Sequence, residues 1–141
     1  MFQESVALYR EVGDPWSLSR ALNALTQYEL SQSRVKEAEV SALHALKTAA
    51  EVEYNLNALE ALANLVTIHA RQGKFQTSLE LALFVQAHSA SSKHARERVE
   101  DIRLKLESQL TPQQIEHASA RVHAMTLTSL VLELAVHQAH L

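Results

Sequence analysis

Apolar residues recur along most of the chain at the three- and four-residue spacing that places them on one face of an α-helix. One such stretch runs from Leu18 to Leu30, and a second runs from Leu59 to Ile68. The alternation of apolar and polar residues that marks a strand is absent. The pattern predicts about eight helices, which span residues 2–12, 15–31, 34–52, 55–72, 75–89, 92–109, 112–124 and 127–139.

Helix-breaking and helix-capping residues fall between these stretches. Gly13 follows one apolar run, and Asp14-Pro15 supplies an N-cap and a first-turn proline for the next helix. Gly73 separates two further helices, and Thr111-Pro112 opens a Thr-x-x-Gln capping box. The connections are two or three residues long, so consecutive helices should pack antiparallel. The sequence therefore predicts an all-α fold of stacked helical hairpins.

The chain also repeats itself at a spacing of 40 residues. Residues 21–25 read Ala-Leu-Asn-Ala-Leu and residues 61–65 read Ala-Leu-Ala-Asn-Leu, and the correspondence continues through a helical hairpin. Ala42-Leu43 matches Ala82-Leu83, for example. A unit of this size buries its apolar face only by stacking on its neighbours. The repeat predicts an array of similar modules.

Composition narrows the class of protein further. Of the residues, 47% are hydrophobic and only 5% are aromatic, so Ala and Leu should fill a core of closely packed helices. The net charge of −3 argues against a general phosphate-binding surface. There is no cysteine, and no apolar run reaches the roughly 18 residues of a membrane span. We expect a soluble cytoplasmic protein that contacts neither membrane nor nucleic acid directly.

Within each hairpin the residues resemble the tetratricopeptide repeat. That repeat has large apolar residues in its first helix, a turn glycine, and small residues in its second helix. Small residues let the two helices approach closely, and large ones fill the remaining space. The first copy of the pattern falls on Leu22, Leu25, Thr26, Ser33, Val35, Ala38, Ala42 and Ala45, and the second on Leu62, Leu65, Val66, Gly73, Phe75, Ser78, Ala82 and Val85.

The chain departs from that repeat in two ways. Thr26 and Val66 stand where the repeat has a glycine in its first helix, and Ser33 replaces the turn glycine of the first copy. The period of 40 also exceeds the usual 34, which implies longer helices in a right-handed solenoid. Long repeats of this kind resemble those in the C-terminal regions of bacterial STAND-type ATPases and LuxR-type regulators. Residues 8–16 are similar to the junction between repeats in that group, and residues 125–135 to its terminal helix.

We expect a single domain, residues 1–141, in which residues 15–52 and 55–89 form two repeats and residues 92–139 form capping helices. Residues 2–12 read as the second helix of a preceding repeat whose first helix is missing. The chain would then be the C-terminal piece of a longer polypeptide. The alternative is a small free-standing protein in which residues 2–12 cap the array or form a homodimer with a second copy.

In this repeat class the first helices line a concave groove that binds partners. The equivalent positions here are Arg20, Asn23, Gln27, Leu30 and Ser31 in one repeat, and Glu60, Ala63, Thr67, Ala70 and Arg71 in the next. Asn23 and Gln27 lie four residues apart on one helix face and suit a peptide backbone. The alternative is that these are ordinary solvated side chains. The Lys/Asn clamp of co-chaperone repeats is not present, which disfavours binding of chaperone tails.

Other chemistry finds little support. His137 and His140 could form half of a metal site, but no carboxylate completes an H-E-x-x-H motif, and we expect no metal or other cofactor. His69 should be a packing residue. Residues 92–105 mix charges of both signs, as on a solvated helix face. No phosphate loop or nucleophile motif is present, so we expect no enzyme activity.

The sequence therefore favours a non-catalytic scaffold that binds a protein or peptide segment, or upstream domains of its own polypeptide. Resemblance to the bacterial regulators implies a sensor or regulatory role in signal transduction. Two alternatives remain open at this point. One is a purely structural C-terminal cap, and the other is a repeat domain that senses a small-molecule effector.

Overall fold

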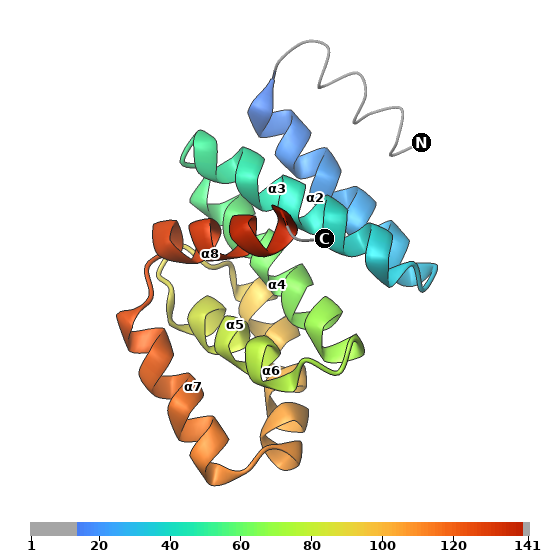
Figure 1. Ribbon diagram of the computed structural model, residues 1–141. Helices are drawn as coiled ribbons and strands as arrows, with labels where there is room; N and C mark the ends of the chain where they lie inside the picture. Colours follow the sequence, from blue (N-terminus) through green and yellow to red (C-terminus); the bar gives the residue numbers. More distant parts are fainter. Residues whose placement is uncertain (1–13, 140–141) are drawn as a thin grey trace.

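A computed structural model describes residues 14–139 of the chain (Figure 1). Over these residues the chain forms seven helices and no strand, which confirms the all-α class. The predicted helix 2–12 lies outside the described residues. The seven helices are α2 (Pro15–Ser31), α3 (Val35–Glu51), α4 (Asn55–Arg71), α5 (Phe75–Ala87), α6 (Lys93–Gln109), α7 (Pro112–Ala124) and α8 (Leu127–Ala139).

The helices begin and end close to the predicted residues because their caps are encoded locally. The Asp14 carboxylate accepts a hydrogen bond from the Ser17 amide at 3.2 Å and so caps α2. Thr111 and Gln114 form the predicted capping box at the start of α7. The largest difference is at α5, which ends two residues before the predicted end because His88 already has extended backbone.

Three identical turns join the first four described helices. Each turn has three residues, and its second residue has left-handed backbone: φ is +59° at Ser33, +56° at Glu53 and +78° at Gly73. The Arg34 amide donates to the Glu29 carbonyl at 2.8 Å, and equivalent bonds close the other two turns. This is the Schellman arrangement. Since α2, α3 and α4 each have 17 residues, the chain reverses direction every 20 residues, which is half of the sequence repeat.

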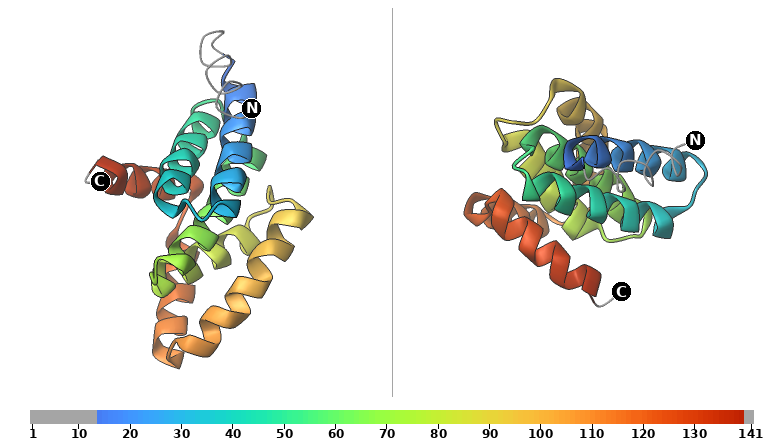
Figure 2. Two further views of the ribbon diagram at one scale, coloured as in Figure 1. Left: turned by 90° about the vertical axis from the view of Figure 1, so that its right-hand side faces the viewer. Right: turned by 90° about the horizontal axis from the view of Figure 1, so that it is seen from above.

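The helices lie in two layers (Figures 1 and 2). α4 packs beside α2 and α6, and these three helices make one layer. α3 and α5 lie in the other layer, where α7 packs on α5 and α8 on α3. The close packing of consecutive helices therefore extends from α2 to α6. Beyond α6 the chain folds back over the second layer instead of continuing the row.

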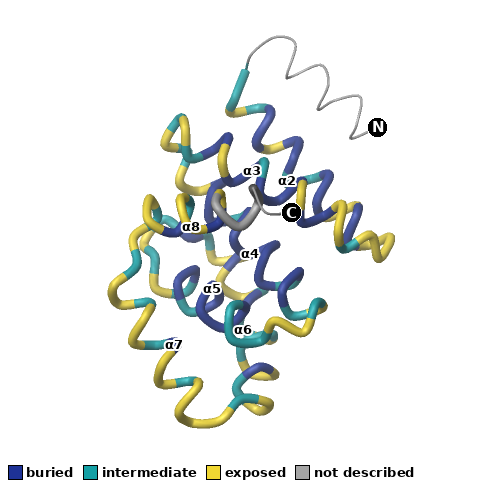
Figure 3. The backbone as a smooth tube through the Cα atoms, viewed as in Figure 1, coloured by how far each residue is buried: buried dark blue, intermediate teal, exposed yellow. Residues whose placement is uncertain are grey.

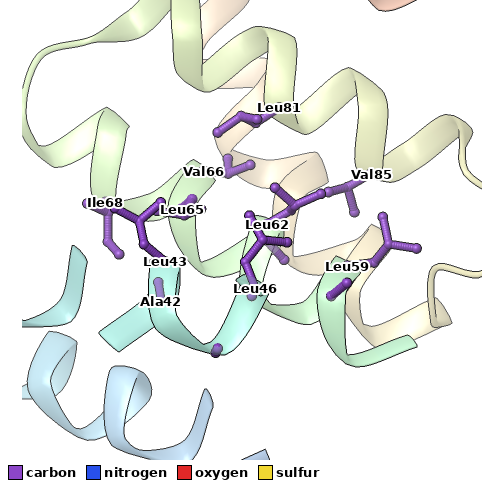
Figure 4. Packing of buried hydrophobic residues seen from close by; sticks show 14 of the residues in the cluster. Ala42, Leu43, Leu46, Leu59, Leu62, Leu65, Val66, Ile68, Leu81 and Val85 are labelled. Atoms are coloured by element: carbon purple, nitrogen blue, oxygen red, sulfur yellow. The ribbon is translucent and has the colours of Figure 1, made fainter. Parts of the chain in front are cut away.

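The core lies between the layers and is made largely of leucine and alanine (Figure 4). Leu46, Leu59, Leu62 and Ile68 are each no more than 1% exposed. Full burial of such a side chain contributes about 1.5–3 kcal/mol. The alanines that the repeat pattern places in the second helices are fully buried, which allows close helix packing. These are Ala38, Ala42, Ala45 and Ala82.

The last two helices are held by smaller contacts. Ala118 of α7 packs with Leu79 of α5 and Leu106 of α6 in a separate cluster, while Leu130 and Leu134 of α8 join the main core. Much of α7 is exposed, whereas α2, α3 and α4 are largely buried (Figure 3). This difference follows from the sequence of α7, in which one narrow apolar stripe faces α5.

An ion-pair network ties these terminal helices to the second layer. Arg121 of α7 donates to both carboxylate oxygens of Glu80 on α5, at 3.1 and 3.2 Å, and to Glu133 of α8 at 3.3 Å. Glu80 is buried, and burial raises the pKa of its carboxyl group, although the charge of Arg121 opposes this. One guanidinium thus joins three helices.

Candidate partner-binding face

The candidate site is the face formed by α2, α4 and α6, which we call the α2–α4–α6 face. Amide side chains on this face bridge α2 and α4. The Asn23 amide donates to the Asn57 carbonyl at 3.1 Å, and the Asn57 amide donates to the Ser19 hydroxyl at 2.9 Å. The Gln27 amide lies against the Asn64 side chain. These contacts hold the two helices in register.

Arg98 extends this row of polar side chains, which we call the polar row, from α4 to α6. Its guanidinium donates to the Asn64 amide oxygen at 2.7 Å and pairs with Glu60 at 3.5 Å. The amide oxygen of Gln27, when it faces Arg98, lies 2.8 and 3.2 Å from the two terminal nitrogens. Burial lowers the pKa of Arg98 and Glu60 opposes the shift, but an arginine remains charged at neutral pH. Ser92 completes the arrangement by donating to Glu60 at 2.8 Å.

Between α2 and α4 lies a hollow of about 240 Å³, which we call the amide hollow. Four of the residues predicted from the repeat positions line it, so the structure brings these four together. The hollow is lined by Arg20, Asn23, Ala24, Gln27, Asn57, Glu60 and Asn64. Amide groups both donate and accept hydrogen bonds, so this lining can pair with a peptide backbone or with polar side chains.

A second hollow of about 410 Å³ lies where α4, α5 and α6 meet, and we call it the cationic hollow. Its apolar part comes from Ala70, Phe75, Ile102 and Leu106. Its polar part includes two cations and no acidic residue. The hollow is lined by Thr67, Ala70, Arg71, Phe75, Ile102, Lys105, Leu106 and Gln109. Thr67 and Arg71 thus lie on the same face as the amide hollow but in a separate depression.

The remaining predicted residues are placed differently. Leu30 is 6% exposed and belongs to the core, which leaves little of its side chain for a partner to contact. Ala63 is 1% exposed and also lies in the core. Ser31 is exposed, and its hydroxyl donates to the Tyr28 carbonyl at 2.6 Å. Arg71, besides lining the cationic hollow, donates to the Leu30 carbonyl at 3.0 Å.

Several residues of this face were not predicted. Asn64 was missed because the 40-residue offset places Ala63 opposite Asn23, whereas in the structure Asn64 fills the polar row. Residues 23–24 read Asn-Ala and residues 63–64 read Ala-Asn, and this reversal indicates that the asparagine moves by one position in the second copy. Arg98 and Lys105 were missed because α6 lies outside the part of the chain that repeats. The face could be extended to them only from the packing of α6 on α4.

The other chemical candidates do not assemble into a site in the described part of the chain. Within residues 14–139, no three His, Cys, Asp or Glu side chains cluster as metal ligands would. His140 and the side chain of His137 lie outside the description. On α6, Arg103 pairs with Glu100 at 2.5 Å and with Glu107 at 2.9 Å. The charged face of α6 is less solvated than predicted, because Arg103 is only 23% exposed and Arg98 packs against Asn64 and Glu60 of α4. His69 is 2% exposed, as predicted for a packing residue.

None of the described helices has both the length and the apolar character needed to cross a membrane. No family model, curated protein or solved structure matches the chain.

Proposed function

We propose that the chain is a non-catalytic, tetratricopeptide-like scaffold that binds a segment of another protein on its α2–α4–α6 face. The observation that carries the proposal is the gathering of Arg20, Asn23, Gln27 and Glu60 around one hollow. Three of these side chains come from α2 and one from α4, and Arg20 and Glu60 occupy equivalent positions of the repeat. A partner on this face would meet a cation and two amides from α2 and a carboxylate from α4.

The packing of the helices supports the comparison with tetratricopeptide repeats. Residues 38, 42, 78 and 82, where that repeat has small side chains, are Ala or Ser and are fully buried. The Ser78 hydroxyl donates to the Val66 carbonyl at 2.7 Å, which ties α5 closely to α4. The α2–α4–α6 row is what a right-handed solenoid of such hairpins would place along its inner surface. The fold-back of α7 and α8 would then form its terminal part.

The wider context that we propose rests on the family resemblance alone. In a bacterial regulator of the STAND or LuxR type, the repeats would act as a cytoplasmic sensor for a protein, or for upstream domains of the same polypeptide. Binding on the α2–α4–α6 face would then control an effector domain elsewhere. Homodimer formation through residues 2–12 is the alternative use of the region before α2.

The proposal can be tested with a displayed library of random peptides screened against the purified chain. The double variant Arg20→Ala/Gln27→Ala removes two exposed side chains of the amide hollow. Its matched control, Lys36→Ala/Lys47→Ala, removes two exposed side chains of α3 in the other layer. Selected peptides should bind the control variant as tightly as they bind the unaltered chain. Their affinity for Arg20→Ala/Gln27→Ala should be at least about fivefold lower.

The control variant should keep the melting temperature of the unaltered chain within a few degrees, because exposed substitutions of this kind change stability little. Arg20→Ala/Gln27→Ala should lose somewhat more, because Gln27 also contacts Asn64, and should still unfold cooperatively. Failure to select any peptide would contradict the proposal and favour a structural cap. Thermal stabilisation by metabolites, with no binding of peptides, would favour an effector-sensing domain.

A further inference from the structure

We infer that the α2–α4–α6 face selects an extended segment with a large apolar side chain at one end and a glutamate about six residues away. The apolar side chain would pack on Trp16 and Leu56, and the glutamate would enter the cationic hollow. The inference rests on the proposed function, because it names the kind of segment that the same face accepts.

The apolar end of the face is marked by two exposed residues. Trp16 is 50% exposed and Leu56 is 45% exposed, and they occupy equivalent positions, 40 residues apart, on the neighbouring helices α2 and α4. Each lies four residues before a residue of the amide hollow, Arg20 or Glu60, and therefore on the same side of its helix. A single exposed apolar residue is common, but these two stand at the same position of neighbouring repeats and on the same side of the layer.

The amide hollow follows directly along the same helices. Gln27 is exposed and Asn23 is partly exposed, whereas Asn57 is buried and its amide already donates to Ser19. The amides of Gln27 and Asn23 can pair with the N–H and C=O groups of an extended main chain without selecting its side chains. The middle of the bound segment should therefore tolerate many residues.

The acidic end follows from the cationic hollow. Arg71 of α4 and Lys105 of α6 are exposed and line a hollow whose apolar surface comes from Phe75, Ile102 and Leu106. Since the whole chain has a net charge of −3, this positive region is local. A glutamate side chain matches it, because its methylene groups can lie on the apolar surface while its carboxylate meets the two cations.

The spacing of the two ends sets the length of the segment. On α4, Thr67 and Arg71 lie about three and four turns beyond Leu56, or about 16 to 22 Å at 1.5 Å per residue. An extended chain advances about 3.3 Å per residue, so the apolar residue and the glutamate should be five to seven residues apart. An even separation directs both side chains to the same side of the segment, and six meets both conditions.

A blocked peptide tests this directly. Acetyl-Leu-Ser-Ala-Ser-Ala-Ser-Glu-amide has the required spacing and no free terminal charge. Acetyl-Ser-Ala-Ser-Ala-Leu-Ser-Glu-amide has the same composition but places leucine and glutamate two residues apart. Trp16 is the only tryptophan of the chain, so its fluorescence reports occupancy of the apolar end. The first peptide should give a saturable change in emission, and the second should bind about fivefold to tenfold more weakly.

Replacing the glutamate of the first peptide by glutamine should weaken binding about threefold to tenfold, as expected for loss of a charge-assisted contact. Lys105→Ala in the protein should remove most of that preference for glutamate, while Lys36→Ala should preserve it. Leu56→Ala should weaken both the glutamate and the glutamine peptide. Added salt should reduce the preference for glutamate, because both cations are exposed.

Equal binding of the two spacings, or of the glutamate and glutamine peptides, would overturn the inference. So would the absence of a fluorescence change up to about 1 mM peptide, which corresponds to about 4 kcal/mol of binding free energy. If library peptides still lose affinity for Arg20→Ala/Gln27→Ala in that case, the proposed function stands and only the chemistry of the segment is wrong. If they do not, the proposed function falls as well.

Discussion

The consequence of removing an apolar side chain depends on whether the residue lies in the core or on the α2–α4–α6 face. Leu62 and Leu56 belong to the same helix, but Leu62 is fully buried and Leu56 is 45% exposed. Leu62→Ala leaves a cavity and should lower the free energy of unfolding by about 2–5 kcal/mol. Leu56→Ala should cost less than about 0.5 kcal/mol. Urea denaturation of both variants measures the difference, and equal losses would contradict the burial of Leu62.

The buried carboxyl group of Glu80 makes the free energy of unfolding depend on pH. Because burial raises the pKa of this carboxyl group above its ordinary value of 4.5, the folded chain holds the proton more tightly than the unfolded chain does. The contribution of Glu80 to the free energy of unfolding is therefore largest below pH 4.5 and falls as the pH rises through the raised pKa. Glu80→Gln removes this dependence. From pH 4.5 to pH 7, the stability of the unaltered chain should decline relative to that of the variant.

This comparison uses the difference between two proteins, so the titration of other groups largely cancels. For example, the hydrogen bond from Arg103 lowers the pKa of Glu100, and this shift is the same in the unaltered chain and in Glu80→Gln. Thermal or urea unfolding at several pH values supplies the measurement. A difference that stays constant with pH would show that Glu80 is not titrating as its burial requires.

At the scale of the elements, the three identical turns set the reversals between α2 and α5. Ser33 and Glu53 have the left-handed backbone that costs an L-residue roughly 1–2 kcal/mol, whereas Gly73 adopts it without that cost. Ser33→Gly should therefore leave stability unchanged or raise it by up to about 1 kcal/mol. Gly73→Ala should lower it by about 1 kcal/mol, although no neighbouring atom would meet the added Cβ. In thermal unfolding, the melting temperature should stay the same or rise for Ser33→Gly and should fall for Gly73→Ala.

The existence of the helices could be predicted because the causes are local. The apolar spacing, the cap at Asp14 and the capping box at Thr111 are each contained within a few residues. The repetition of the turns was only partly visible, because Ser33 and Glu53 occupy positions where glycine would have been recognised. Helix boundaries were least predictable at α5, where the backbone becomes extended at His88 without a glycine or a proline.

The candidate site was harder to predict because it depends on contacts between helices. Transfer of repeat positions identified Arg20, Asn23, Gln27 and Glu60, which line the amide hollow. It could not identify Arg98, because α6 has no counterpart in the 40-residue repeat. The same reasoning placed Leu30 on the groove, although the structure buries it in the core.

At the scale of the whole molecule, the second layer is completed by α7 and α8 folding back over α5 and α3. Arg121 joins these helices, so Arg121→Ala should loosen both and leave the buried Glu80 carboxylate without its partner. Because Arg121 is partly exposed, we expect a loss of about 1–3 kcal/mol rather than that of a fully buried pair. Amide hydrogen exchange should accelerate most in α7 and α8 and least in α4. Uniform acceleration throughout the described helices would contradict a local role for this network.

The proposed binding face is a property of the whole molecule, since α2, α4 and α6 form it only when they pack in one layer. It is tested most directly by mapping a bound peptide through the amide chemical shifts of the isotope-labelled chain. A peptide selected from the displayed library should perturb α2, α4 and α6, with the largest changes near Arg20, Gln27 and Arg71. The amides of α3 and α8 should change little. Perturbations concentrated on the second layer, with the α2–α4–α6 face unaffected, would contradict the account.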